Sequence, residues 1–169
     1  LPGNVVAEWN AIAQEILQPT PVPGMPMVMS SISMSKSFVI LAYMQAAVYD
    51  ALVAIEGGYE PYNAGILQFS NSAASRESAV ATAAFQVLDN YLKTEINYAT
   101  AIKPVLDGKY ADALAAIPDG TAKTAGIAIG NAAAAGIIAL RAGDVLAGNG
   151  GYVVPPPGPG VWEANVMNG

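Results

Sequence analysis

The sequence predicts an all-α protein: a bundle of about five helices around a buried central helix, with an extended C-terminal arm rich in proline and glycine. Three observations favour this fold. The stretch from Lys36 to Ile55 is apolar at nearly every position, other segments repeat apolar residues at helical spacing, and clusters of proline or glycine separate these segments. We therefore divide the chain into a helical domain, residues 1–147, and an arm or linker, residues 148–169.

The first predicted helix runs from about residue 5 to Leu17, with Asn4 as its N-cap and Trp9 as its anchor in the core. Prolines then prevent the helix from continuing. Met27 and Met34 lie in the segment that connects this helix to the next one. Methionine side chains there either fill irregular gaps under a loop, which we favour, or line a pliable apolar ligand site.

The stretch from Lys36 to Ile55 reads as a helix with no face open to water, and we place it at the centre of the bundle. Gly57 and Gly58 are suited to end it. Its length raises the possibility of a membrane span, but Asp50 in its interior disfavours insertion, and we expect no span.

Asp50 is expected to be a buried carboxylate hydrogen-bonded to another helix, because an unpartnered buried carboxylate is too unfavourable to keep. A metal site formed by Asp50 with Glu56 and Glu60 is the less favoured alternative. For the protein as a whole, one alternative is that the central helix and the fifth helix form a hairpin embedded in a membrane.

Three more helices are predicted, over about 76–92, 95–117 and 121–141. Ile96 is assigned to the inward face of the second of these, and Pro104 is expected to kink or divide that helix. Asp119 or Thr121 is expected to cap the last helix. The turn before it should make the last two helices antiparallel neighbours.

Small residues recur every four positions in the last helix, at Gly126, Gly130 and Ala134. Such a ridge lets another backbone approach closely, and tight packing within the bundle is the simpler interpretation. Dimerisation through the ridge is the alternative. In the arm beyond it, Trp162 is expected to fix an extended, proline-rich segment to a surface.

Composition excludes several classes of function. The chain has 13 acidic and 7 basic residues and a net charge of -6, so it lacks the clustered cations that nucleic acids require. It contains no cysteine and no histidine. Disulfides, thiolate chemistry and imidazole-based catalysis or metal binding are therefore impossible for this chain.

Several segments together resemble a known superfamily. They are VVAEWNAIAQE, LAYMQAAVYDALVAIEGGYEPY, AIPDGTAKTAGIAIGNAAAAGIIALRAGD and GPGVW, in this order. Their order and separation resemble the N-terminal helical half of the vanadium-dependent haloperoxidase and type 2 phosphatidic acid phosphatase superfamily. Many relatives have histidine where Gln45 stands, ahead of the triplet Tyr49-Asp50-Ala51.

The resemblance implies a catalytic pocket in a second half, built from lysine, arginines, a Ser-Gly-His element and a further histidine. This chain has no Ser-Gly-His and no histidine, so no catalytic, cofactor-binding or metal-binding residue carries over. Vanadate is implied only if a catalytic half exists elsewhere. Because the chain begins at Leu1 and resembles this superfamily, we expect a processed, secreted protein.

We therefore expect a non-catalytic, haloperoxidase-like helical domain that acts by self-association as a homodimer or by binding a small apolar ligand. Alternatively, it is the N-terminal fragment of a haloperoxidase or phosphatase, whose catalytic half would be its partner. This chain alone is not expected to be an enzyme. The structural or ligand-lining candidates are Trp9, Met27, Met34, Gln45, Tyr49, Asp50 and Trp162.

Overall fold

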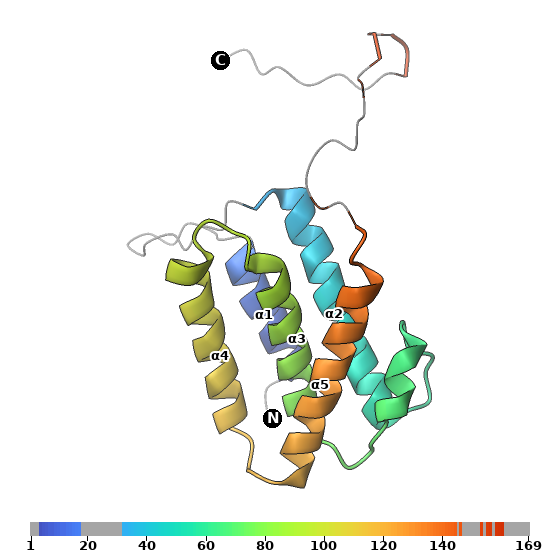
Figure 1. Cartoon of the computed structure of the whole chain (residues 1–169), viewed down its shortest axis with the longest axis vertical. Helices are drawn as coiled ribbons and strands as arrows, with labels where there is room; N and C mark the ends of the chain where they lie inside the picture. Colours follow the sequence, from blue (N-terminus) through green and yellow to red (C-terminus); the bar gives the residue numbers. More distant parts are fainter. Residues whose placement is uncertain are drawn as a thin grey trace.

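The all-α bundle predicted from the sequence is confirmed (Figure 1). The computed structural model describes residues 4–17, 32–144, 146, 153, 155–156 and 158–160. These residues contain five α-helices, two shorter helical segments and no β-strand. In chain order the elements are α1 (Val5–Leu17), α2 (Met34–Glu56), the 3₁₀ segment η1 (Ala64–Phe69), α3 (Arg76–Leu92), the π-helical segment η2 (Tyr98–Ile102), α4 (Lys103–Ala115) and α5 (Thr121–Leu140).

The ends of the first two helices follow the local signals in the sequence. The side chain of Asn4 accepts a hydrogen bond from the Val6 N–H at 3.1 Å, as expected of an N-cap. The helix α2 ends at Gly57, where φ is 67°, and Gly58 follows with φ of 78°. Because these positive angles are unfavourable for other residues, the two glycines stop the helix as predicted.

The centre of the bundle is α3, and the prediction that Lys36–Ile55 occupies it was wrong. Helix α3 packs against α1, α2, α4 and α5. Every residue from Ser78 to Ala84 is buried, so all sides of that part of the helix are covered (Figure 1). The physical reason is side-chain size, because alanines, serine and threonine let four neighbouring helices approach.

Helix α2 also has an outer face, contrary to the prediction that no face is open to water. Phe38 is 55% exposed, and Ala42 and Tyr49 on the same side are exposed as well. The opposite side packs on α3, flanked by α1 and α5. By length and composition α2 and α5 could each cross a membrane, but core helices of soluble proteins share these properties.

The fourth predicted helix is divided near Pro104, as the sequence suggested. The π-helical segment η2 ends at Ile102, and Pro104 lies in the first turn of α4. Proline is tolerated there because backbone N–H groups in the first turn form no hydrogen bond within the helix. Ile96 was assigned wrongly to the inward face, because it lies in the turn before η2 and is 94% exposed.

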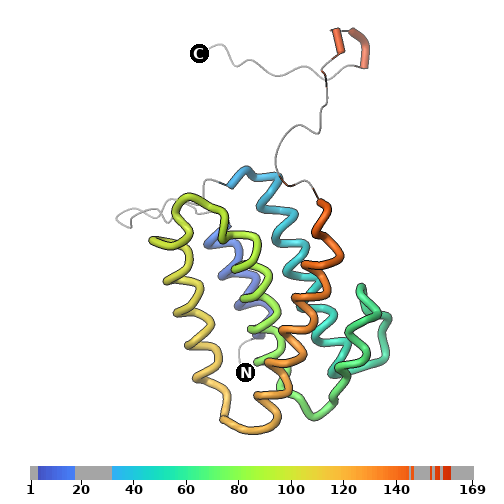
Figure 2. The backbone as a smooth tube through the Cα atoms, in the orientation of Figure 1, coloured from blue at the N-terminus to red at the C-terminus, as the bar shows by residue number. Residues whose placement is uncertain are grey.

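Helices α4 and α5 are not packed neighbours, although a short turn joins them. Helix α3 lies between them, and α5 packs on α3 and α2 instead (Figure 2). The prediction from loop length therefore failed, because the small side chains of α3 offered α5 a closer surface than α4 did.

The predicted cap of α5 was also wrong. Gly120, with φ of 154°, occupies the N-cap position, and no side chain of the described residues caps the helix. Asp119 instead forms an ion pair with Lys123 at 2.8 Å, one turn along the chain. Thr121 is the first residue of the helix itself.

The ridge of small residues on α5 packs against α3. A Cβ atom added at Gly126 would lie 2.1 Å from the Ser78 Oγ, and one added at Gly130 would lie 2.5 Å from the Ala79 carbonyl oxygen. Both glycines and Ala134 are buried. Packing within the bundle is therefore the correct interpretation, and the ridge is not available for dimerisation.

The predicted C-terminal arm is described only in part. Residues 153, 155–156 and 158–160 form no helix or strand, and Val153 is exposed. The boundary proposed at residues 147–148 and the anchor Trp162 lie outside the described residues, as does Met27.

Substituting Gly130 with alanine should lower the free energy of unfolding by about 1–3 kcal/mol, because the new methyl group would meet the backbone of α3. Gly108→Ala is the matched control. A Cβ atom there meets nothing within 4 Å in the middle of α4, so that change should stabilise the protein by about 0.5–1 kcal/mol. Urea denaturation followed by circular dichroism measures both changes, and equal effects would contradict the close contact.

Candidate functional site

A cavity of about 150 Å³ lies between α2 and α5. Two alanines of α2, Ala42 and Ala46, stand one turn apart and face Ile137 of α5. The short alanine side chains leave the space that larger residues would fill. The remaining wall is formed by Tyr43, Tyr62 and Arg141.

Arg141 supplies the positive charge at this cavity. It directly follows α5, where a cation also interacts favourably with the C-terminal end of the helix dipole. Its guanidinium carbon lies 5.7 Å from the ring centre of Tyr43 and 5.5 Å from that of Tyr62, within the range of cation–π attraction. Its Nη2 also donates a hydrogen bond to the Tyr62 hydroxyl.

Asp144 balances this charge. One of its carboxylate oxygens lies 3.7 Å from the Nη1 of Arg141 and accepts a hydrogen bond from the Tyr43 hydroxyl. Burial, and then the hydrogen bond to Asp144, raise the pKa of Tyr43 to about 12. A phenol is neutral near pH 7 at its ordinary pKa, and this rise keeps Tyr43 neutral to a higher pH.

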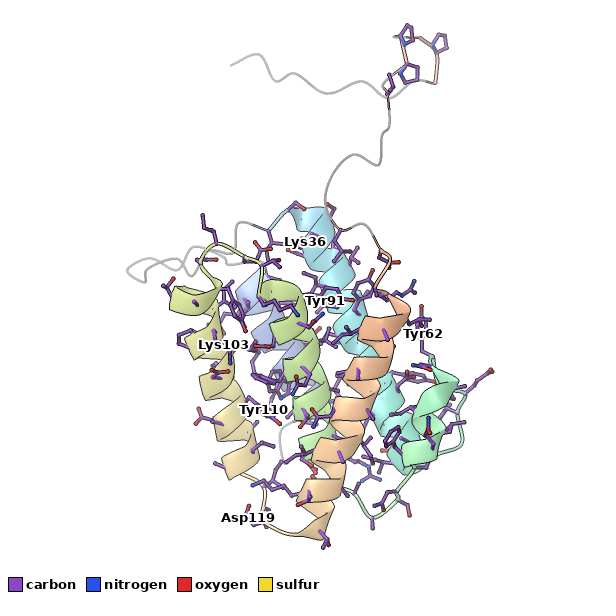
Figure 3. All side chains as sticks on the ribbon, in the orientation of Figure 1. Lys36, Tyr62, Tyr91, Lys103, Tyr110 and Asp119 are labelled. Carbon is purple, nitrogen blue, oxygen red and sulfur yellow. The ribbon has the colours of Figure 1, made fainter. Side chains whose placement is uncertain are left out.

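Tyr91 of α3 completes the polar cluster. Its ring packs on that of Tyr43 with centres 5.1 Å apart. Burial, followed by the charge of Asp144, raises the pKa of Tyr91 above its ordinary value. In Figure 3, Tyr91 and Tyr62 lie at the same end of the bundle, near the C-terminal end of α5.

Two buried polar atoms of this cluster have no hydrogen-bond partner among the described residues. They are the Nε of Arg141 and the hydroxyl oxygen of Tyr91. An unsatisfied buried group of this kind typically costs about 1–3 kcal/mol. Arg141 lines the cavity with other atoms, because its Nε is buried out of contact with the open space there.

Asp50 holds Tyr62 in place at the edge of the cavity. Its carboxylate accepts the backbone N–H of Tyr62 at 2.6 Å and that of Asn63 at 3.0 Å. Burial raises the pKa of Asp50, and the hydrogen bond from Asn63 partly opposes that rise. Asp50 is thus buried and bonded as predicted, but its partners belong to the loop before η1 and not to another helix.

Three other predicted residues have structural contacts away from the cavity. Trp9 is buried and packs edge-on against Tyr110, which confirms it as a core anchor. The Gln45 amide donates to the Asn10 side chain at 3.0 Å and so ties α2 to α1. Tyr49 donates its hydroxyl hydrogen to the Glu60 carbonyl at 2.8 Å.

Met34 is 70% exposed at the start of α2 and is not among the residues that line this cavity. The alternative carboxylate cluster is not assembled either. Glu56 pairs with Arg76 at 2.6 Å, and both oxygens of Asp50 accept backbone hydrogen bonds. Within the described part of the chain, no group of three or more acidic residues is arranged to hold a metal ion.

Sequence reasoning missed the polar residues that line the cavity, Tyr43, Tyr62 and Arg141, and the two that contact them, Tyr91 and Asp144. The sequence indicated Arg141 only weakly as a site residue, because it is one of two arginines in the chain and follows a long apolar helix. Nothing in the order of residues indicated that Tyr43 and Tyr62, from two separate segments, would contact it.

Asp50→Ala should lower the free energy of unfolding by about 1–3 kcal/mol, because it leaves the N–H groups of Tyr62 and Asn63 without an acceptor. Asp50→Asn retains one acceptor oxygen and should lower the free energy of unfolding by a smaller amount. The control is Asp112→Ala on the exposed side of α4, which should change stability by no more than about 0.5 kcal/mol. Urea denaturation measures all three, and an Asp50→Ala protein as stable as the control would contradict this role.

Comparison with known proteins returned no match of any kind: no family model, no curated protein and no solved structure matches the chain. The resemblance to the haloperoxidase and phosphatase superfamily therefore stays a prediction.

Proposed function

We propose that this protein is a non-catalytic helical domain that binds a small apolar molecule in the cavity between α2 and α5. The observation that supports the proposal is the cavity itself, which has apolar walls and few polar groups. Ligand sites in proteins commonly combine these features. The cavity is partly open to solvent, and its volume of about 150 Å³ equals that of an enclosed protein cavity that binds benzene.

The chemistry around the cavity supports binding without catalysis. The chain contains neither histidine nor cysteine. Arg141 is the charged residue in the cavity lining, and the carboxylate of Asp144 faces it. This arrangement offers apolar contacts but no activated nucleophile.

Benzene should bind the wild-type protein with a dissociation constant of about 1 mM, as expected for so small a ligand. Chemical shift changes in NMR spectra should be concentrated at Ala42, Ala46 and Ile137. Ala46→Leu should weaken this binding about tenfold or more, because its side chain would occupy the cavity.

The control is Ala135→Leu, which adds the same atoms on the exposed side of α5 and should leave benzene binding unchanged. Both variants should keep the helical circular dichroism spectrum of the wild type. Benzene binding that is equal in Ala46→Leu and wild type, or absent from the wild type, would refute the proposal.

Self-association is a second candidate function, supported by the outer face of α2. Phe38, Ala42 and Tyr49 form an exposed, largely apolar strip along one side of this helix. Only 12% of all residues are charged, so little charge opposes close approach of a second copy.

If a second copy covers this strip, light scattering should give the mass of a dimer for the wild type. Phe38→Lys should give the mass of one chain, because it places a charge in the contact. Phe69→Lys is the matched control, since Phe69 is similarly exposed but belongs to η1. A monomeric wild type, or a Phe38→Lys dimer, would exclude this contact.

A further inference from the structure

The chain contains two aspartates that are followed by glycine, Asp107-Gly108 and Asp119-Gly120. In such a pair the backbone nitrogen of the glycine is able to attack the carboxyl carbon of the aspartate, and no Cβ atom on the glycine hinders that approach. Each aspartate forms an ion pair with a lysine four residues away, Lys103 or Lys123. The two pairs therefore match in sequence and in charge, and they differ in the structure of the backbone.

Asp119-Gly120 lies in the turn between α4 and α5, at the opposite end of the bundle from Lys36 (Figure 3). The Asp119 side chain is 96% exposed, so no packed neighbour fixes it. The N–H of Gly120 donates no hydrogen bond to any of the described residues. The nitrogen and the carboxyl group of this pair are thus both open to reaction.

Asp107-Gly108 lies in the middle of α4. In an α-helix each N–H group is hydrogen-bonded to the carbonyl four residues earlier, which holds the glycine nitrogen in place. Helical side chains also point back toward the N-terminus, away from the nitrogen that follows. Attack on Asp107 therefore requires local unfolding of α4.

We propose that Asp119 is a site of spontaneous covalent modification, at which aspartate isomerises to isoaspartate through a cyclic imide formed with the nitrogen of Gly120. The nitrogen forms a bond to the Cγ of Asp119 and loses its proton, and the carboxyl group loses an oxygen as water. A water molecule then adds to the main-chain carbonyl carbon and breaks its bond to the nitrogen. One water is released and one is consumed, so the reaction needs no other reactant.

Lys123 slows this reaction. Its Nζ lies 2.8 Å from a carboxylate oxygen of Asp119 and also donates to the Ile117 carbonyl at 3.2 Å. The hydrogen bond from Lys123, and then its charge, hold the pKa of the Asp119 carboxyl below its ordinary value. A carboxylate is a poorer target for the nitrogen than a neutral carboxyl group, because it is negatively charged and has no good leaving group.

Isomerisation at Asp119 would act on the start of α5. Isoaspartate adds one methylene group to the main chain immediately before this helix. The next residues are bonded to α3, because the Ala122 carbonyl accepts the Ser75 N–H at 2.9 Å and the Lys123 carbonyl accepts the Ser78 hydroxyl hydrogen at 3.0 Å. The modification therefore lies beside the close contact between α3 and α5.

The wild-type protein tests the site with its own internal control. The full chain is incubated at physiological pH and temperature, and electron-transfer mass spectrometry of its peptides measures isoaspartate at each position. The isoaspartate fraction at Asp119 should exceed that at Asp107 about tenfold or more, because α4 must first open locally. Equal fractions, or no isoaspartate at Asp119, would overturn the proposal.

Asp119→Asn and Asp107→Asn test the backbone attack without the influence of carboxylate charge. An amide loses ammonia more readily than a carboxylate loses water, so deamidation reports whether the following nitrogen reaches the side chain. Asp119→Asn should deamidate about tenfold faster than Asp107→Asn, since only the latter is held within a helix. Equal rates in the two variants would contradict the proposed difference in backbone structure.

Lys123→Gln tests the restraint. It should raise the rate of isomerisation at Asp119 about two- to fivefold, the range expected from loss of one exposed ion pair. Lys123→Arg keeps the charge and should isomerise at the wild-type rate. A wild-type rate in Lys123→Gln would show that the ion pair does not slow the reaction. The comparison of Asp119 with Asp107 in the wild type decides the site even if Lys123→Gln does not fold.

Discussion

The close contact between α3 and α5 is the constraint on which the rest of this structure depends. Gly126 and Gly130 leave no room for a Cβ atom against α3, so the two helices are in close contact there. The Ser78 hydroxyl hydrogen-bonds the Lys123 carbonyl across this contact at 3.0 Å. Because α5 lies so near α3, it also meets α2, and the space left beside Ala42 and Ala46 becomes the cavity.

A second set of contacts connects the interior of α2 to the edge of that cavity. Asp50 is buried within the helix and holds the backbone of Tyr62, and the Tyr62 ring in turn faces Arg141. Asp50 therefore acts structurally, as its position in an apolar helix predicted. Its effect on ligand binding would be indirect, through the placement of Tyr62. The polar chemistry of the site comes instead from Arg141 and Asp144, just beyond the end of α5.

Local signals were sufficient where a helix end depends on its own residues. Asn4 caps α1, Gly57 and Gly58 end α2, and Pro104 opens α4, all as the residue types predict. Local reasoning failed at Asp119, which could cap a helix by type but pairs with Lys123 instead. It failed again for Ile96, whose apolar side chain is exposed in a turn. Of the candidate site, only the burial and bonding of Asp50 were foreseen, because a charge in an apolar helix needs a partner whatever the fold.

The sequence by itself determined the fold class, the positions of the helices and the absence of thiol and imidazole chemistry, because these depend on residue types and short-range spacing. Only the tertiary structure decided which helix is central. The apolar residues of Lys36–Ile55 predicted that this helix would be central. A helix with several close neighbours instead needs small side chains, which α3 has. The tertiary structure also decided the site, since Tyr43, Tyr62, Tyr91 and Arg141 come from four separate segments. Contacts between residues so far apart in the chain arise from how the helices pack and leave no periodic pattern in the sequence.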